Sequence, residues 1–319
     1  MNQAEAEALF GQMLDGEMAD EAIAATLIEL ADRGETAPEI AGAVRAMRAR
    51  MKPITGPAGA IDVCGTGGDG QHSLNVSTAV ALVVAACDVP VAKHGNRAAS
   101  SLAGGADTLE ALGLNLARAS DMAEETLGDL GIAFLFAQAH HPALGRIAPI
   151  RRALGRRTIF NLLGPLANPA GVTRQLVGVS HPSLIALYRD AMQLLGTEAA
   201  LIVSGAEGLD ELSIEGTSYL AAIGLPPLPI EITPGDAGLI PHPLADLRGG
   251  DAGFNAAALK RLLLGEAGAY RDAVLLNSAA ALIVAGQVTD LLEGVEEAAE
   301  ALDKGLANAL LDCWVETVR

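Results

Sequence analysis

The sequence contains few cysteines and few basic residues. Its cysteines, Cys64, Cys87 and Cys313, are scattered and form no CxxC pair. We therefore expect neither a disulfide framework nor a thiolate zinc site, and the pattern is typical of a reducing compartment. Lys and Arg number 21 against 39 Asp and Glu, which gives a formal charge of -18. Such a chain is not expected to bind nucleic acid, because nucleic acid usually binds a basic surface.

Long hydrophobic runs are also missing, and no signal peptide is expected. The longest apolar stretches, residues 77–87 and 279–285, are shorter than the roughly 20 residues that a membrane-spanning helix needs. The acidic N-terminal segment lacks the basic and apolar regions of a signal peptide. We therefore expect a cytoplasmic protein with no membrane partner.

Acidic residues are absent from one part of the chain. Residues 130–189 contain no Asp or Glu, although the overall composition predicts about seven there. The same window contains Arg146, Arg151, Arg152, Arg156, Arg157, Arg174 and Arg189. A positive region within an acidic protein indicates a focused anion site. Arginines on a solvated helix face are the alternative interpretation.

The first 60 residues are predicted to form a small helical domain. In residues 20–34, Ile23, Leu27 and Leu30 recur at helical spacing. The next helix opens at Thr36, with Glu39 at the spacing of a capping box. Residues 52–59, rich in Pro and Gly, are predicted to be a linker or hinge. We expect part of residues 145–175 to join this domain.

Residues 61–319 are predicted to form a larger α/β domain. Short apolar segments that alternate with helical stretches predict strands at 60–65, 89–95, 132–137, 175–180 and 200–206. This alternation is typical of a mostly parallel, buried central sheet. The end of the chain, from about residue 255, is predicted to be helical.

A glycine-rich segment follows the first predicted strand. Residues 65–70 read GTGGDG, and glycine is favoured where the main chain approaches a ligand closely. Such loops present backbone N–H groups to phosphates. The segment lacks the lysine ending of a nucleoside-triphosphate loop and the spacing of a dinucleotide fingerprint. It indicates another phosphate chemistry, and a tight structural turn is the alternative.

Two polar segments accompany the glycines. Residues 75–78, read NVST, open an apolar helix, so Ser77 and Thr78 lie at the positive end of its dipole. They could bind an anion or metal, or only cap the helix. Residues 93–97, read KHGNR, end a predicted strand and are followed by Ser100 and Ser101. Strand ends of this kind are where α/β sheets bind ligands.

Two further segments carry groups that suit a metal and a carboxylate ligand. Asp210 and Glu211 follow the strand at 200–206, and such oxygens hold magnesium against a diphosphate, although adjacent acids are also common on solvated surfaces. In the acid-free window, His141 and Arg151 precede the corner at Gly164. An arginine there can bind a carboxylate with two parallel hydrogen bonds.

Together these segments resemble the anthranilate phosphoribosyltransferase family. GTGGDG, NVST, KHGNR, GADTLEALG, FLFAQAHHPAL, RTIFNLLGPLANP and SGAEGLDELS occur in the family's order and spacing, and the resemblance runs to about Trp314. It implies a fold of the nucleoside phosphorylase/phosphoribosyltransferase class and a homodimer. It also implies transfer of phosphoribosyl from 5-phosphoribosyl 1-diphosphate (PRPP) to anthranilate, with Mg²⁺ as cofactor, in tryptophan biosynthesis.

The resemblance also implies roles for individual residues. The PRPP contacts would be Gly65, Gly68, Asp69, Ser73, Asn75, Val76, Ser77, Thr78, Lys93, His94, Gly95, Asn96, Arg97, Ala98, Ala99, Ser100, Ser101 and Gly105. The anthranilate contacts would be Gly65, His94, Asn96, His141, Arg151 and Gly164. Ser77, Asp210 and Glu211 match the family's magnesium ligands.

The sequence departs from the family pattern at two positions. Many members have serine where this chain has Gly105, and a basic residue is common where it has Leu102. The missing hydroxyl at residue 105 predicts weaker donor binding more than loss of activity, because a backbone N–H can substitute for it.

Two other functions remain open from the sequence alone. A pyrimidine nucleoside phosphorylase shares the fold and similar glycine and lysine segments, although KHGNR and FNLLGPLANP resemble the transferase. A non-catalytic nucleic-acid-binding relative is the second alternative, and the charge of -18 and the Asp210–Glu211 pair both oppose it.

The role implied for Arg151 makes a first prediction. Replacing Arg151 with Ala should raise the KM for anthranilate more than the KM for PRPP, because the guanidinium orients only the acceptor carboxylate. Steady-state kinetics with each substrate varied in turn measures the two constants. Equal effects on both would contradict the assignment.

Overall fold

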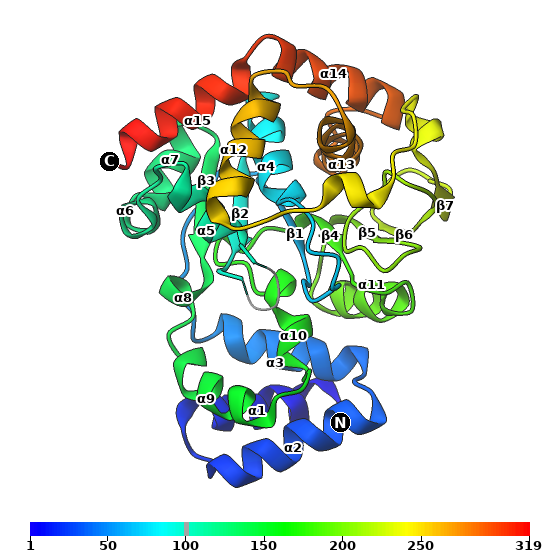
Figure 1. Cartoon of the computed structure of the whole chain (residues 1–319). Helices are drawn as coiled ribbons and strands as arrows, with labels where there is room; N and C mark the ends of the chain where they lie inside the picture. Colours follow the sequence, from blue (N-terminus) through cyan, green and yellow to red (C-terminus); the bar gives the residue numbers. More distant parts are fainter. Residues whose placement is uncertain (99–101) are drawn as a thin grey trace.

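The computed structural model describes residues 1–98 and 102–319. Three residues of the predicted donor site, Ala99, Ser100 and Ser101, lie outside the described residues. A smaller helical part, which includes the N-terminus, lies below a larger part built around a sheet (Figure 1). Within the described residues, no helix has the length and apolar character that crossing a membrane requires.

The smaller part contains the three helices at the start of the chain and two helices from the acid-free window. The former are α1 (Gln3–Asp15), α2 (Asp20–Arg33) and α3 (Ala37–Arg48). The predicted capping box at Thr36 and Glu39 is present. From later in the chain, α9 (Leu144–Leu154) packs on α1 and α2, and α10 (Phe160–Leu163) contacts α3. One such contact is an edge-to-face pair of Phe10 with Phe160 at 5.8 Å.

The larger part is built on a seven-stranded sheet of order β3-β2-β1-β4-β5-β6-β7. The five predicted strands are confirmed to within two residues: β1 (Ile61–Gly65), β2 (Val91–Gly95), β3 (Ile132–Phe136), β4 (Arg174–Gly178) and β5 (Ala199–Gly205). All five pair in parallel, as the apolar runs predicted. Two antiparallel strands that the sequence did not predict complete the sheet beyond β5, β6 (Ser218–Ile223) and, at the edge, β7 (Glu231–Ile232).

Helices cover both faces of this sheet. On one face α4 (Val76–Ala86) and α13 (Ala269–Ala285) pack together, and α11 (Leu184–Leu194) packs on the other (Figure 1). The predicted helical C-terminal region is confirmed as α12 (Ala252–Leu263), α13, α14 (Leu291–Asp303) and α15 (Leu306–Thr317). The remaining helices are α5 (Gly105–Ala111), α6 (Leu116–Asp121), α7 (Ala123–Asp129), α8 (Ala137–His140), and the 3-10 turns η1 (Gly164–Leu166), η2 (Pro234–Ala237) and η3 (Leu244–Leu247).

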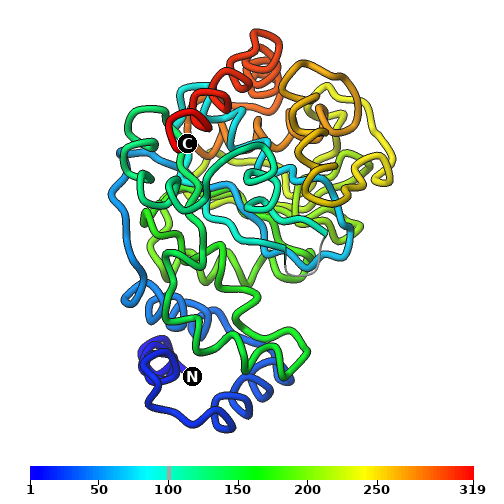
Figure 2. The backbone as a smooth tube through the Cα atoms, turned by 60° about the vertical axis from the view of Figure 1, so that its left-hand side comes forward, coloured from blue at the N-terminus to red at the C-terminus, as the bar shows by residue number. Residues whose placement is uncertain are grey.

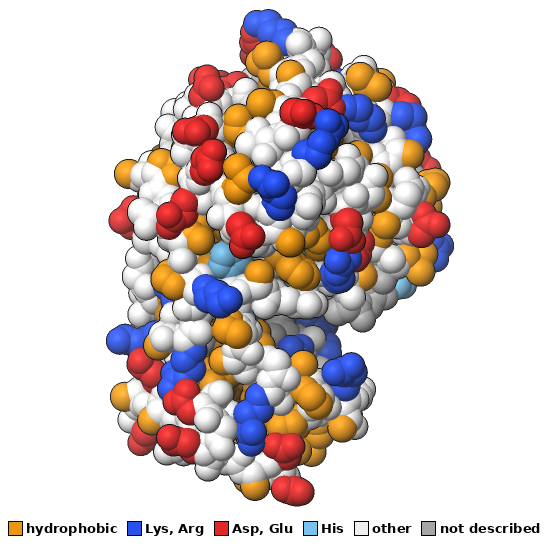
Figure 3. Space-filling model, turned by 90° about the vertical axis from the view of Figure 1, so that its left-hand side faces the viewer, with side chains coloured by type: hydrophobic (Ala, Val, Ile, Leu, Met, Phe, Trp, Pro, Cys, Tyr) orange, Lys and Arg blue, Asp and Glu red, His pale blue; other side chains and the backbone are white. Residues whose placement is uncertain are grey.

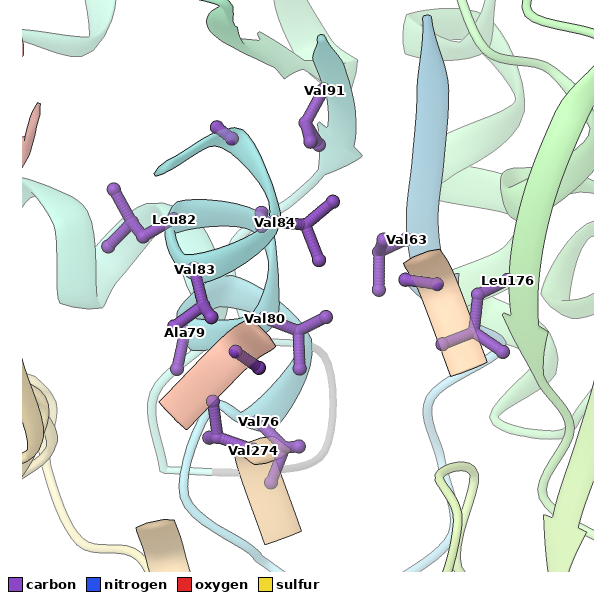
Figure 4. Packing of buried hydrophobic residues seen from close by; sticks show 14 of the residues in the cluster. Val63, Val76, Ala79, Val80, Leu82, Val83, Val84, Val91, Leu176 and Val274 are labelled. Atoms are coloured by element: carbon purple, nitrogen blue, oxygen red, sulfur yellow. The ribbon is translucent and has the colours of Figure 1, made fainter. Parts of the chain in front are cut away.

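The main core lies between the sheet and α4. Figure 4 shows Val80 and Val84 of α4 pointing toward Val63 of β1, with Val274 of α13 packed nearby. Helix α4 is apolar all round because α13, α14 and α15 also pack against it. Its buried position fixes its N-terminus, where Ser77 and Thr78 lie, at the C-terminal edge of the strands.

The first connection between the two parts runs beside later segments of the chain (Figure 2). Residues 52–60, which include the predicted linker, form neither helix nor strand. The Lys52 N–H donates to the His140 carbonyl at 2.7 Å, and the Ile54 N–H donates to the Pro169 carbonyl at 3.1 Å. The Thr55 N–H also donates to Glu124 Oε1 at 2.6 Å. The segment is therefore tied to the α/β part, and its role as a hinge stays a prediction.

A pair of glycines tests how tightly the helical part is packed. A Cβ at Gly42 in α3 would lie 2.4 Å from the Gln3 carbonyl oxygen and 2.6 Å from Ala6 Cβ, whereas one at Gly128 in α7 would meet nothing within 4 Å. Gly42→Ala should therefore lower the free energy of unfolding by about 1–3 kcal/mol. Gly128→Ala should raise it by up to about 1 kcal/mol through helix propensity. Urea denaturation measures both, and equal effects would contradict this packing.

Candidate active site

The candidate site lies at the C-terminal edge of the sheet, where its strand order changes direction. Strands β1, β2 and β3 progress toward one edge, and β4 and β5 progress toward the other. The crevice between β1 and β4 is thus a topological switch point, the usual ligand site of open α/β sheets. It faces the smaller helical part (Figure 1). The space-filling view shows a waist between the two parts, with Lys and Arg side chains close to it (Figure 3).

The glycine loop leaves β1 at this crevice. Gly67, Gly68 and Gly70 take left-handed φ values of 65°, 71° and 76°, which favour glycine. The Gly67 N–H donates to Asp210 Oδ2 at 2.7 Å. A Cβ at Gly65 would lie only 2.2 Å from that same oxygen. The loop is therefore bare partly because a carboxylate from the loop after β5 packs directly against it.

Three carboxylates converge beside the glycine loop. Burial, and then the charge of Asp69, raises the pKa of Asp210 to about 7. Burial, and then the charge of Asp210, raises the pKa of Glu211 well above its ordinary value, and Lys93 opposes this shift. Asp69 has one oxygen, Oδ2, that is buried without a hydrogen-bond partner. The crowding of these groups favours binding of a cation.

The same residues fit a magnesium ion that binds together with a phosphate. Glu211 Oε1 accepts from the Ser77 N–H at 3.2 Å, which brings the hydroxyl of Ser77 beside the carboxylates. Within residues 1–98 and 102–319, no three His, Cys, Asp or Glu side chains are arranged to hold a metal alone. Magnesium is commonly bound by one or two carboxylates, with phosphate oxygens and waters as its other ligands. The donor set agrees with this mode.

Lys93 connects the sheet to the start of α4. Its Nζ donates to the Val63 carbonyl at 2.8 Å and to Ser77 Oγ at 3.2 Å, and the side chain is buried. This places a positive charge beneath the helix N-terminus that carries Ser77 and Thr78. Both features stabilise an anion bound above them.

Other residues of the predicted donor set have structural roles. The Asn75 amide joins α4 to its neighbours, because its Nδ2 donates to the Ala103 carbonyl and its Oδ1 accepts from Thr108 and Asn255. Val76 is 2% exposed and its side chain belongs to the core. Ser73 forms a bridge with Arg248 that holds the end of the glycine loop.

Acidic side chains of α5 form hydrogen bonds with residues that follow β2. Arg97 pairs with Asp107 and Glu110 at 2.8 Å each, and its guanidinium lies 5.7 Å from the centre of the Phe136 ring. The Ala98 and Gly104 N–H groups donate to the other oxygen of Asp107. Arg97 was expected to face the donor, yet its charge is neutralised within the protein.

The two departures from the family pattern differ in their surroundings. A Cβ at Gly105 would lie 2.8 Å from Thr78 Oγ1, so a serine here would require the threonine to shift. Leu102 is 71% exposed. The Gly95 position is equally restricted, since a Cβ there would meet the Phe134 ring at 2.6 Å.

The predicted acceptor residues include a pair of neutral histidines. His94 Nδ1 lies 3.0 Å from the Gly164 carbonyl oxygen, and its ring centre lies 5.2 Å from that of His141. Burial lowers the pKa of His94 to about 3 and that of His141 to about 4. The Nε2 atoms of both rings are buried without a partner. At pH 7 the pair is an uncharged wall that suits an aromatic ligand.

Arg151 remains available for an anion. The side chain is half-buried on α9, where Nη2 lies 3.4 Å from Asn161 Oδ1 and the guanidinium lies 5.6 Å from the centre of the Phe160 ring. Both contacts are neutral, and burial lowers its pKa without discharging it. Asn96, from the same predicted set, is exposed, and its Oδ1 accepts from the Arg97 N–H.

A buried polar pair that the sequence analysis did not select supports this wall. Asp62 is fully buried in β1, and its oxygens accept from the His94 N–H at 3.0 Å and from Asn168 Nδ2 at 2.7 Å. Asn168 also donates to the Ala92 carbonyl at 2.8 Å. The pair ties the segment around Gly164 to β1 and β2. An acid within an apolar strand was the available signal, because burial of a charge requires partners.

Comparison with known proteins first defines the class. The description "Glycosyl transferase family, helical bundle domain" matches residues 1–51, and "Glycosyl transferase family, a/b domain" matches residues 58–308. The chain belongs to this glycosyl transferase family. Within it, the chain is a member of the anthranilate phosphoribosyltransferases, as relatives 66% and 43% identical to it show.

The first relative is the anthranilate phosphoribosyltransferase of Novosphingobium aromaticivorans, 66% identical over 316 residues, which are 99% of this chain and 96% of the relative. The crystal structure of the Thermus thermophilus enzyme matches with a TM-score of 0.95 at 43% identity, over 100% of this chain and 96% of that one. The Saccharomyces cerevisiae enzyme in complex with PRPP and Mg matches with a TM-score of 0.89 at 27% identity, over 99% and 93%. A second yeast structure, with 4-fluoroanthranilate, matches with a TM-score of 0.89 at 26% identity, over 99% and 93%.

These findings confirm the family, the enzyme class and the fold that the sequence predicted. Family membership decides against the pyrimidine nucleoside phosphorylase and the nucleic-acid-binding relative. The roles of individual residues stay predictions.

The neutral histidines make a prediction about stability and pH. Because the pKa of His141 falls from 6.5 to about 4 on folding, the unfolded chain binds more protons between these values. Stability is therefore lost as the pH falls through this range. Replacing His141 with Gln should flatten the fall by up to about 1.4 kcal/mol per pH unit. Urea titrations at several pH values measure the slope, and an unchanged slope would show that His141 titrates normally.

Proposed function

We propose that the chain transfers the 5-phosphoribosyl group of PRPP to the amine of anthranilate and releases diphosphate, a step of tryptophan biosynthesis. The observation that carries this proposal is the contact between the Asp210 carboxylate and the Gly67 N–H at the switch point between β1 and β4. It brings a glycine loop of the kind that binds phosphate next to a carboxylate of the kind that binds magnesium. The similarity to relatives of the same activity over nearly the whole chain supports it.

In this proposal the donor lies over the glycine loop and the start of α4. Backbone N–H groups of the loop from Gly65 to Asp69 would bind the diphosphate, with Ser77 and Lys93 beside them. Ser77, Asp210 and Glu211 would hold magnesium. When bound, magnesium stabilises negative charge on the leaving diphosphate. The PRPP and Mg bound by the yeast relative support this assignment.

The acceptor would lie against the neutral wall formed by His94, His141 and Gly164. Arg151 would bind its carboxylate, because among the described residues that guanidinium has only neutral contacts. An aromatic amine is uncharged at neutral pH and is already nucleophilic, so no strong general base is required. The 4-fluoroanthranilate bound by the yeast relative supports an acceptor of this class.

The bond changes follow from these positions. The ribose C1–O bond breaks with its electron pair leaving on the diphosphate, and the amine lone pair forms the new C1–N bond. The amine then releases one proton to water. The transition state carries positive charge on the ribose and negative charge on the diphosphate, so the protein acts mainly by positioning the reactants and stabilising charge.

Three further features belong to the same proposal. The helical part, residues 1–60 with α9 and α10, would close on the α/β part, residues 61–319, by bending near residues 52–60. The chain would form a homodimer through its helical part. It would work in the cytoplasm, and three free thiols are compatible with a reducing compartment.

The decisive experiment follows the fluorescence of anthranilate. Purified protein with PRPP and Mg²⁺ should remove the anthranilate signal, and leaving out any one of these three should prevent the loss. Asp210→Asn should lower kcat/KM by about 100-fold or more, because it removes one charge of the magnesium site. A folded protein that leaves anthranilate fluorescence unchanged under all conditions would overturn the proposal.

A further inference from the structure

Arg157 lies at the switch point. It begins the motif RTIFNLLGPLANP and belongs to the acid-free window, but the sequence assigned no contact to it. It belongs to the segment between α9 and α10, which passes from the helical part toward the sheet (Figure 1). Its Nη1 donates to the Gly68 carbonyl of the glycine loop at 3.2 Å, and its Nη2 lies 3.3 Å from Ser180 Oγ. Gly68 follows β1 and Ser180 follows β4. One guanidinium therefore bridges the two strands that flank the crevice.

The charge of Arg157 is not neutralised. Its acceptors are a carbonyl and a hydroxyl, and no carboxylate of residues 1–98 and 102–319 pairs with it. The neighbouring Arg156 pairs with Asp32 at 2.6 Å. Arg97, which the family resemblance assigned to the donor, is paired with Asp107 and Glu110. Of these three arginines, only Arg157 offers an unpaired positive charge beside the glycine loop.

The composition of the site makes that charge useful. Asp69, Asp210 and Glu211 bring negative charge to the loop, and the buried Lys93 opposes the charge of Glu211. A bound diphosphate adds further negative charge to the same place. Each additional cation within reach of its oxygens therefore lowers the energy of the bound and departing anion.

We propose that Arg157 binds the diphosphate of the donor and of the product, as a further contact residue of the reaction; this rests on the proposed function. The side chain is exposed, and its present bonds go to neutral acceptors, which are exchanged for a phosphate oxygen at little cost. Arg157 Nη1 lies 3.2 Å from the Gly68 carbonyl oxygen. Phosphate oxygens held by the loop therefore come within reach of the guanidinium when the side chain rotates. Charge on Arg157, rather than its hydrogen bond to Gly68, is the feature that matters.

The test compares Arg157→Gln with the matched control Arg156→Gln. The glutamine at 157 keeps a hydrogen-bond donor and removes the charge, and Arg157→Lys keeps the charge. Isothermal titration calorimetry with inorganic diphosphate and Mg²⁺ measures binding directly, and steady-state kinetics gives the KM for PRPP and for anthranilate. For Arg157→Gln we expect diphosphate affinity to fall and the PRPP KM to rise, each about five- to tenfold at low salt, with a smaller change at high salt. The anthranilate KM should stay within about twofold.

Outcomes separate this inference from the proposed function. Arg157→Lys should recover most of the diphosphate affinity, and Arg156→Gln should behave as the wild type. If wild-type protein turns over anthranilate but Arg157→Gln binds diphosphate normally, or Arg156→Gln loses the same affinity, the role of Arg157 is overturned while the function stands. If Arg157→Gln weakens diphosphate binding but the wild type does not consume anthranilate, the anion contact stands and the proposed function fails.

Discussion

The contact between Asp210 and the glycine loop is the constraint on which the candidate site depends. A Cβ at Gly65 would lie 2.2 Å from Asp210 Oδ2, and one at Gly178 would lie 1.6 Å from the Asp210 carbonyl oxygen. Both glycines end neighbouring parallel strands, where they are paired in register. The absence of two side chains thus admits a carboxylate-bearing loop into the crevice. Without that space, the loop and the carboxylates could not share one ligand.

The structure separates a charged region from a neutral one within a short distance along β2. Lys93 and His94 are consecutive residues, and their side chains point to opposite faces of the strand. The Lys93 side chain is hydrogen-bonded to Ser77 beside the carboxylates, whereas the His94 side chain is hydrogen-bonded to the Gly164 carbonyl beside His141. Because side chains alternate between the two faces of β2, the donor half and the acceptor half of the proposed site differ in charge. Under the proposed function, charge would be stabilised where diphosphate leaves, and the aromatic ring of the acceptor would meet an uncharged surface.

The arginines of the acid-free window, residues 130–189, have two different roles, which the count of charges in the sequence could not distinguish. Some of its arginines stabilise the helical part, such as Arg146 with Asp20 and Arg156 with Asp32. Others, Arg151 and Arg157, have neutral contacts and face the candidate site. Acidic partners for the first group come from α2, which is remote in sequence. The composition therefore predicted the excess charge, and packing decided which part of it is available.

The sequence by itself determined the family, the two-part organisation and the five parallel strands, because long apolar runs and several ordered motifs act locally along the chain. It also predicted the C-terminal ends of those strands as the site. Tertiary structure decided which polar residues are free. Arg97 is neutralised by Asp107 and Glu110, Asn75 is bonded to Asn255, and Asp62 is buried against Asn168. The strands β6 and β7 were also beyond the sequence, since β6 is stabilised by antiparallel pairing with β5, and β7 by antiparallel pairing with β6. In each case the partner lies on another element, and only the folded chain brings the two together.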